Sequence, residues 1–226
     1  MGNTIKKFSI SKKGSVPVND MFDQSFRKML AVSASDAPTP GGGSVSAMVG
    51  ALGVAMAAMV GNLTLGKPKY ADVQAEIKEI TGKAYFIIAR LEKLVAADIA
   101  AFGKFMEVYR LPKNTDEEKA KREEAMQKAL KTATNEPVEI ARTLLEALVI
   151  TESLSKIGNK MAISDAGVAA YVCEAAINSV LLSADINIPM ITDQEFVKAI
   201  KDEKNNLVSE AKRLKDLAVA KVNERM

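Results

Sequence analysis

Hydrophobic positions recur every three or four residues along almost the whole chain, and alternating β-branched runs bounded by turns do not occur. This pattern predicts an all-α protein, a helical bundle in which amphipathic helices surround two buried helices of small residues. After an irregular arm over residues 1–16, a first helix is expected from about residue 18 to residue 33. We expect residues 17–226 to form a single helical domain.

The second expected helix covers about residues 44–63 and is apolar on all sides, which indicates burial. No charged residue occurs between Asp36 and Lys67, so a membrane span is an alternative by length. The Ala, Gly, Ser and Met content and the missing aromatic belt favour a core helix instead. Four small residues would let neighbouring helices approach closely: Gly50, Gly53, Ala57 and Gly61.

A third, long helix is expected over residues 70–109, with an apolar stripe at alternating spacings of three and four. Continuing this stripe from Leu94 leads to Asp98 and then to Phe102, so an acid stands where a hydrophobic residue is expected. A buried lone carboxylate is costly, so Asp98 must be paired, hydrogen-bonded or protonated. Two interpretations are open, namely a structural carboxylate satisfied by a neighbouring helix and a catalytic acid.

The second half of the chain predicts three more helical segments. Thr115 and Glu118 have the spacing of a capping box, and Pro137 should kink or break the helix that they open. Ser164 is expected to be the N-cap of a second inner helix that ends near residue 184. Thr192 should open a final amphipathic helix that runs to the C-terminus.

The amino-acid composition limits which functions and which catalytic groups are open to this chain. A net charge of +3 over 226 residues is too small to indicate nucleic-acid binding. The chain has no histidine, which excludes imidazole catalysis and leaves acid–base work to Asp, Glu, Lys, Tyr or Cys. The single cysteine, Cys173, cannot form a disulfide within the chain, and we expect a cytoplasmic protein.

Each inner helix follows a polar turn, PTPGGGS before the first and GNKMAISD before the second. A helix N-terminus offers unpaired N–H groups and a positive dipole end to an anionic or acceptor-rich ligand. If both N-termini point the same way, they frame one site. We therefore expect Gly42, Asp98 and Asp165 to meet at a single cavity.

The segment from residue 38 to residue 70 resembles the signature of the cyclodeaminase/cyclohydrolase family, and it reads PTPGGGSVSAMVGALGVAMAAMVGNLTLGKPKY. This family comprises the C-terminal domain of formiminotransferase-cyclodeaminase and its free-standing bacterial relatives. Three further blocks agree in order and spacing: Asp98-x-x-Ala101-Phe102, Leu111-Pro112 with the charged run after it, and Gly158-Asn159 followed by Ser164-Asp165-Ala166-Gly167-Val168. In the stretch around Asn187, Ser183 and Asp185 replace commoner family residues. The resemblance covers about residues 18–200.

The resemblance implies an all-helical enzyme, typically a dimer, that acts at the methenyl bridge of tetrahydrofolate. Cyclohydrolases open this bridge with water to give 10-formyltetrahydrofolate, and cyclodeaminases form it from formiminotetrahydrofolate with loss of ammonia. Because no transferase domain is attached, we favour the cyclohydrolase. We expect no metal, no cofactor beyond tetrahydrofolate as the substrate carrier, and no membrane. A non-catalytic helical binding protein is a third hypothesis.

Within this interpretation, Asp98 is the first candidate for general acid–base catalysis. Asp165 would stabilise the cation or hold the pterin, although the swapped assignment is also open. Lys67 would hold the glutamyl tail or stand beside the reacting centre. The glycine turn would let the backbone touch a flat ring, and amides would bind the pterin. The expected substrate-binding residues are Pro40, Gly41, Gly42, Gly43, Ser44, Asn62, Asn159, Ser164 and Asn187.

Overall fold

The computed structural model describes residues 21–226, so the expected arm over residues 1–16 lies outside the described residues. In the described part, every regular element is helical and no strand occurs, which confirms the all-α prediction. The α-helices are α1 (Phe26–Ser33), α2 (Gly42–Thr64), α3 (Gln74–Tyr109), α4 (Asp116–Ile157), α5 (Ile163–Asp185) and α6 (Gln194–Arg225). Short 3₁₀ turns lie at η2 (Pro68–Val73), η3 (Lys160–Ala162) and η4 (Ile188–Met190).

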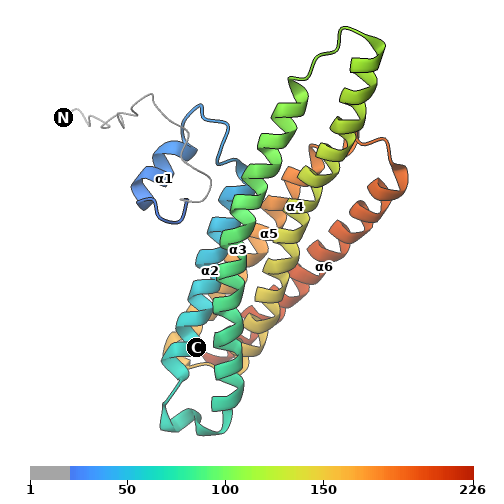
Figure 1. Ribbon diagram of the computed structural model, residues 1–226. Helices are drawn as coiled ribbons and strands as arrows, with labels where there is room; N and C mark the ends of the chain where they lie inside the picture. Colours follow the sequence, from blue (N-terminus) through green and yellow to red (C-terminus); the bar gives the residue numbers. More distant parts are fainter. Residues whose placement is uncertain (1–20) are drawn as a thin grey trace, which may run out of the picture.

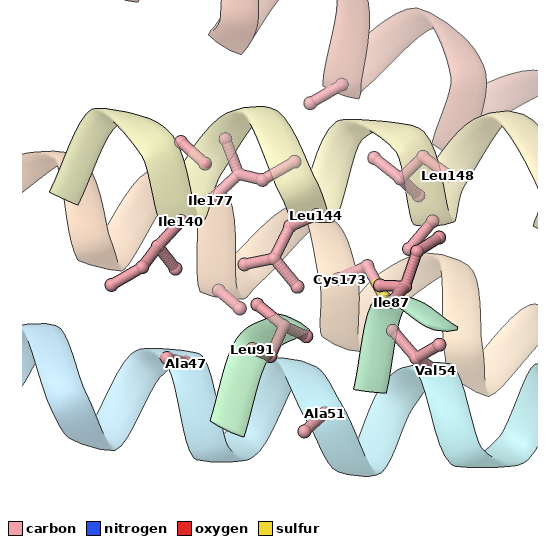
Figure 2. Packing of buried hydrophobic residues seen from close by; sticks show 14 of the residues in the cluster. Ala47, Ala51, Val54, Ile87, Leu91, Ile140, Leu144, Leu148, Cys173 and Ile177 are labelled. Atoms are coloured by element: carbon pink, nitrogen blue, oxygen red, sulfur yellow. The ribbon is translucent and has the colours of Figure 1, made fainter. Parts of the chain in front are cut away.

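Helices α2 to α5 form an antiparallel four-helix bundle (Figure 1). Helix α2 packs against α3 and α5, α4 packs against the same two helices, and α6 lies across α4 and α5. Each short connection reverses the chain direction, so α2 and α5 run antiparallel to each other. Side chains from all four bundle helices meet in the core, as Figure 2 shows for Val54, Leu91, Leu144 and Ile177.

Small residues on α2 let its neighbours pack directly on its backbone. A Cβ atom built on Gly53 would lie 2.9 Å from Val172 Cγ1 of α5. A Cβ atom on Gly50 would overlap Leu144 of α4, and one on Gly61 would overlap Thr81 of α3. The prediction that these glycines permit close helix packing is confirmed.

Two helical stretches, Gly42–Thr64 and Lys160–Met190, are long and apolar enough to cross a membrane by length and composition. They are α2 and the stretch from η3 through α5 to η4, and 61 % and 50 % of their most apolar windows are buried inside the protein. Core helices of soluble proteins pass the same test. The outer sides of both helices still expose large apolar side chains, among them Leu52 (57 % exposed) and Leu182 (67 % exposed).

Several helix ends differ from the sequence-based expectation. Helix α1 begins later than expected because the side chain of Ser25 caps it by accepting a hydrogen bond from the Lys28 N–H. Ser164 is not an N-cap, because the turn η3 leads directly into α5 one residue earlier. Asp193 rather than Thr192 caps α6, and the capping box of Thr115 on α4 is present as predicted.

Of the two effects predicted for Pro137, a break does not occur, since α4 continues through it to Ile157. A proline has no N–H group, so the carbonyl of Ala133 loses its normal partner one turn earlier in the helix. The side-chain amide of Asn187 donates a hydrogen bond to that carbonyl, at 3.1 Å. A residue beyond the end of α5 therefore satisfies the defect that the proline creates.

Candidate active site

A cavity of about 600 Å³ lies at the N-terminus of α2. This volume suits a small-molecule ligand. Its walls come from the start of α2, the second half of α3, the region of α4 around Pro137, and the C-terminal end of α5. Apolar side chains, including Phe102 and Phe105, form most of the lining, and a few polar groups, including Asp98 and Asn187, face it.

The start of α2 lacks a side-chain cap of its own, because its N-cap residue is Gly41. Asp98 of α3 supplies the missing partner. Its carboxylate accepts a hydrogen bond from the Ser44 hydroxyl at 2.6 Å and another from the Ser44 backbone N–H. The negative charge thus lies at the positive end of the α2 dipole, where it is stabilised. Asp98 was expected to be paired, hydrogen-bonded or protonated, and these two contacts confirm the hydrogen-bonded alternative.

Gly43 permits this approach. A Cβ atom at this position would lie 2.9 Å from Asp98 Oδ1 and 3.0 Å from Oδ2, closer than real Cβ atoms come to such oxygens. Any larger residue would push the carboxylate away from the helix start. The glycine turn was expected to let the backbone touch a flat ring, and the close neighbour that the structure shows at Gly43 is instead the carboxylate of Asp98.

The environment of Asp98 favours its protonated form relative to an ordinary aspartate. Burial raises the pKa of Asp98 above its usual value of 3.8, and the hydrogen bonds from the Ser44 hydroxyl and backbone only partly oppose this effect. A carboxyl group with a raised pKa can both take and return a proton, as general acid–base catalysis requires. The protein has no histidine to do so.

Sequence reasoning missed Glu136, a second carboxyl group near Asp98. Burial raises the pKa of Glu136, and the negative charges of Asp98 and Glu139 raise it further. Burial would raise the pKa of Glu139 as well, but hydrogen bonds from Arg142 and Arg90 outweigh it and lower the pKa. The position of Glu136 directly before a proline was the one signal in the sequence that could have drawn attention to it. Its closeness to Asp98 arises only from the packing of α3 against α4.

The structure brings part of the predicted site together. The cavity is lined by Gly41, Gly42, Gly43, Ser44, Asp98 and Asn187. Pro40 is buried beside the cavity, between the lining residues Thr39 and Gly41, and does not itself line it. These predicted residues therefore lie around one cavity in a single chain.

The other predicted residues lie at the opposite end of α2, about 35 Å away for a helix of its length. They are Lys67, Asn62, Asn159, Ser164 and Asp165. The backbone N–H of Asn159 donates to Thr64 Oγ1 at 2.8 Å, which places the start of α5 beside the end of α2. The expectation that both inner N-termini face one cavity is wrong within one chain, because α2 and α5 are antiparallel.

Two of the asparagines at that end are engaged in the fold. The Asn159 amide donates to the Leu63 carbonyl at 2.8 Å, and its oxygen accepts from the Met161 N–H at 3.0 Å. Asn62 donates to the hydroxyl of Tyr85 at 2.8 Å. These contacts tie the end of α2 to its neighbours.

The described part of the chain shows neither a metal-binding cluster nor a reactive thiol. Over residues 21–226, no group of three or more Cys, Asp or Glu side chains is arranged to hold a metal ion. Burial raises the pKa of the Cys173 thiol to about 12, so it is protonated at neutral pH and is not a ready nucleophile.

Comparison with known protein families identifies the family of this chain. The sequence profile of the formiminotransferase-cyclodeaminase family matches residues 25–206. The chain belongs to this family. Membership confirms the resemblance inferred from the glycine turn and the Asp98 block, and with it the prediction of an enzyme.

Named relatives of the family fall into two activities. The chain is 41 % identical over 194 residues to a methenyltetrahydrofolate cyclohydrolase of Methylorubrum extorquens, covering 84 % of this chain and 93 % of that protein. It is 33 % identical over 196 residues to the mouse formimidoyltransferase-cyclodeaminase, covering 87 % of this chain but 36 % of that protein. The chain thus spans about a third of the length of this bifunctional relative.

A solved structure shows the same fold. The formiminotetrahydrofolate cyclodeaminase of Thermotoga maritima is similar with a TM-score of 0.80 and 29 % identity. The match covers 89 % of this chain and 96 % of that one. The bundle is therefore shared along nearly the full length of that chain.

Proposed function

We propose that this enzyme hydrolyses 5,10-methenyltetrahydrofolate to 10-formyltetrahydrofolate in the cavity at the start of α2. The observation that carries the proposal is the carboxyl group of Asp98, half-buried in this cavity and held by Ser44. The 41 % identity to a cyclohydrolase over 93 % of that protein's length supports the choice of reaction. The glycine turn and the two phenylalanines offer flat and apolar surfaces to a pterin ring.

The methenyl bridge is an amidinium-like cation, so its carbon is already electrophilic. In the proposed reaction, ionised Asp98 takes a proton from water as the oxygen attacks this carbon. The resulting tetrahedral adduct collapses when the C–N bond to one ring nitrogen breaks, and protonated Asp98 returns the proton to that nitrogen. The hydroxyl group of the adduct releases its own proton to water, so the product carries the carbon as a neutral formyl group and Asp98 regains its charge.

The start of α2 has a second use in this proposal. The N–H groups of Gly42 and Gly43 belong to the first turn, which has no partners within the helix. Both glycines line the cavity, so in this proposal their N–H groups donate to a substrate oxygen, such as the hydroxyl that forms on the adduct. The glycines thus provide both close approach and hydrogen-bond donors.

Cyclodeaminase activity is the second candidate, because the similar Thermotoga maritima structure carries that name. The two reactions share methenyltetrahydrofolate as product or substrate, so the same acid–base group serves both. The purified protein should be assayed for loss of methenyltetrahydrofolate absorbance and, in parallel, for ammonia release from formiminotetrahydrofolate. Faster ammonia release would assign the enzyme to the cyclodeaminases, and failure of both assays would favour a binding protein.

The proposal includes no metal and no further cofactor, because the bridge carbon needs no added activation. It also includes a cytoplasmic location, which the single thiol of the sequence suits. Acid–base chemistry alone is required of the protein.

A homodimer is also proposed, and the uncharged outer side of α2 supports it. The exposed or half-exposed side chains there follow a helical spacing: Val45, Val49, Leu52, Met56, Met59 and Leu63. A twofold axis perpendicular to α2 would place the Lys67 end of one chain beside the Gly42 end of the other. In this arrangement Asp165 and Lys67 would contribute to the partner's cavity.

A further inference from the structure

The amide of Asn187 is fixed by a defect in a neighbouring helix. Pro137 leaves the carbonyl of Ala133 without an intrahelical donor. Asn187 Nδ2 donates to this carbonyl at 3.1 Å and to the carbonyl of Ser183 at 3.2 Å. All four residues line the cavity.

This contact determines which amide atom is free. A side-chain amide has two donor hydrogens on nitrogen and one acceptor oxygen. Both hydrogens of Asn187 point to carbonyl oxygens, so turning the amide over would place three oxygens against one another. The amide oxygen has no hydrogen-bond partner among residues 21–226, and it belongs to a residue in the cavity wall.

We propose that Asn187 determines substrate specificity by presenting this oxygen to an N–H group of the substrate's fused pyrimidine ring, and that Pro137 is the positioning residue that holds the oxygen in place. The inference rests on the proposed function and names the part of the substrate that this wall recognises. Ring N–H and exocyclic amino groups are donors, and Asn187 supplies an acceptor that cannot rotate into a donor. An analogue without the donor would leave the oxygen unpaired and bind poorly.

A purely structural role for Asn187 is the competing interpretation, since its amide also satisfies the Ala133 carbonyl. The two roles separate in a Pro137→Ala background. There the N–H of residue 137 reaches the Ala133 carbonyl as in an ordinary helix, so that carbonyl no longer needs Asn187. A ligand contact made by the amide oxygen would still be lost when Asn187 is removed.

The experiment compares Asn187→Ala in the natural and the Pro137→Ala backgrounds, with KM for methenyltetrahydrofolate, the Kd of tetrahydrofolate by calorimetry, and Tm as readouts. In the natural background, Asn187→Ala should lower Tm and raise KM and Kd about ten- to a hundredfold. In the Pro137→Ala background it should lower Tm by less, because only the bond to the Ser183 carbonyl is then lost, but it should still raise both constants. The rise should be smaller there, because the amide is no longer fixed before the substrate binds.

Asn178→Ala is the matched control, because the Asn178 amide bonds to Glu174 within α5 and does not line the cavity. Its KM and Kd should equal those of the natural protein. Unchanged constants on removing Asn187 in the Pro137→Ala background would overturn the inference and leave Asn187 a structural residue. A natural protein that neither binds tetrahydrofolate nor turns over the substrate would instead overturn the proposed function.

Discussion

At the scale of single residues, Asp98 has two roles that depend on the same contacts. It caps the start of α2 through Ser44, and its burial raises its pKa. A helix cap prefers an ionised carboxylate, whereas a proton carrier needs a pKa nearer to neutral. The hydrogen bond from the Ser44 hydroxyl lowers the pKa of Asp98, and burial raises it. The two opposing effects keep the pKa raised, but by less than burial alone would raise it.

The pH dependence of activity should therefore report Asp98. Asp98 must be ionised to accept a proton from water, so kcat/KM should fall as the pH drops through a value above 3.8, the ordinary value for aspartate. Ser44→Ala removes a hydrogen bond that lowers this pKa, so the acid limb should move to higher pH. Steady-state kinetics between pH 4 and pH 9 would measure the shift, and a limb that stays in place or moves down would contradict the assignment.

Substitution of Gly43 tests the close approach. In Gly43→Ala, the new methyl group would displace the Asp98 carboxylate, so we expect a large loss of kcat and a destabilisation of about 1–3 kcal/mol. Gly82→Ala on α3 is the matched control, because a Cβ atom there meets nothing within 4 Å. The control should keep full activity and gain about 0.5–1 kcal/mol from helix propensity. Equal behaviour of the two variants would refute the steric role of Gly43.

At the scale of helices, α2 is held by contacts with its backbone rather than with long side chains. Gly50, Gly53 and Gly61 admit side chains of α4, α5 and α3 in turn. This packing explains how a helix of small residues can pack closely against three neighbouring helices. It also fixes the position of Gly42 and Gly43 relative to α3, and hence the geometry of the site.

Helix packing at Gly50 is tested by urea unfolding. Gly50→Ala should lower the free energy of unfolding by about 1–3 kcal/mol, because its methyl group would overlap Leu144. Gly103→Ala, on an open surface of α3, should raise it slightly. A stabilised Gly50→Ala variant would show that α2 and α4 are packed less closely than described.

At the scale of the whole molecule, local sequence patterns predicted the helices and the site residue Asp98, but they did not predict the relative directions of the helices. Periodicity located α2 to α6, and Asp98 was found because a charge interrupted an apolar stripe. The prediction that the N-termini of α2 and α5 converge on one cavity was wrong within one chain. The three chain reversals between these helices already imply that they run in opposite directions. The pairing of Asn187 with Pro137 joins residues fifty positions apart, so no local pattern contains it.

The proposed dimer makes a prediction about this end-to-end arrangement. Light scattering should give a mass twice the chain's 24.3 kDa, and Leu52→Glu should yield a folded monomer by placing a charge in the interface. If the site is shared, a mixture of inactive Asp98→Asn and Asp165→Asn chains should regain part of the activity after subunit exchange, because some mixed dimers contain one intact site. A natural protein of single-chain mass would contradict both expectations.

The most direct test of the account is the initial rate of methenyltetrahydrofolate hydrolysis by the natural protein and by Asp98→Asn, measured at saturating substrate beside the uncatalysed rate. Asparagine keeps an acceptor oxygen for Ser44 but cannot carry the proton. We predict a natural enzyme far faster than buffer and a variant that still binds tetrahydrofolate while its kcat is about 10²–10⁴-fold lower. A variant with nearly natural kcat would contradict the central role of Asp98.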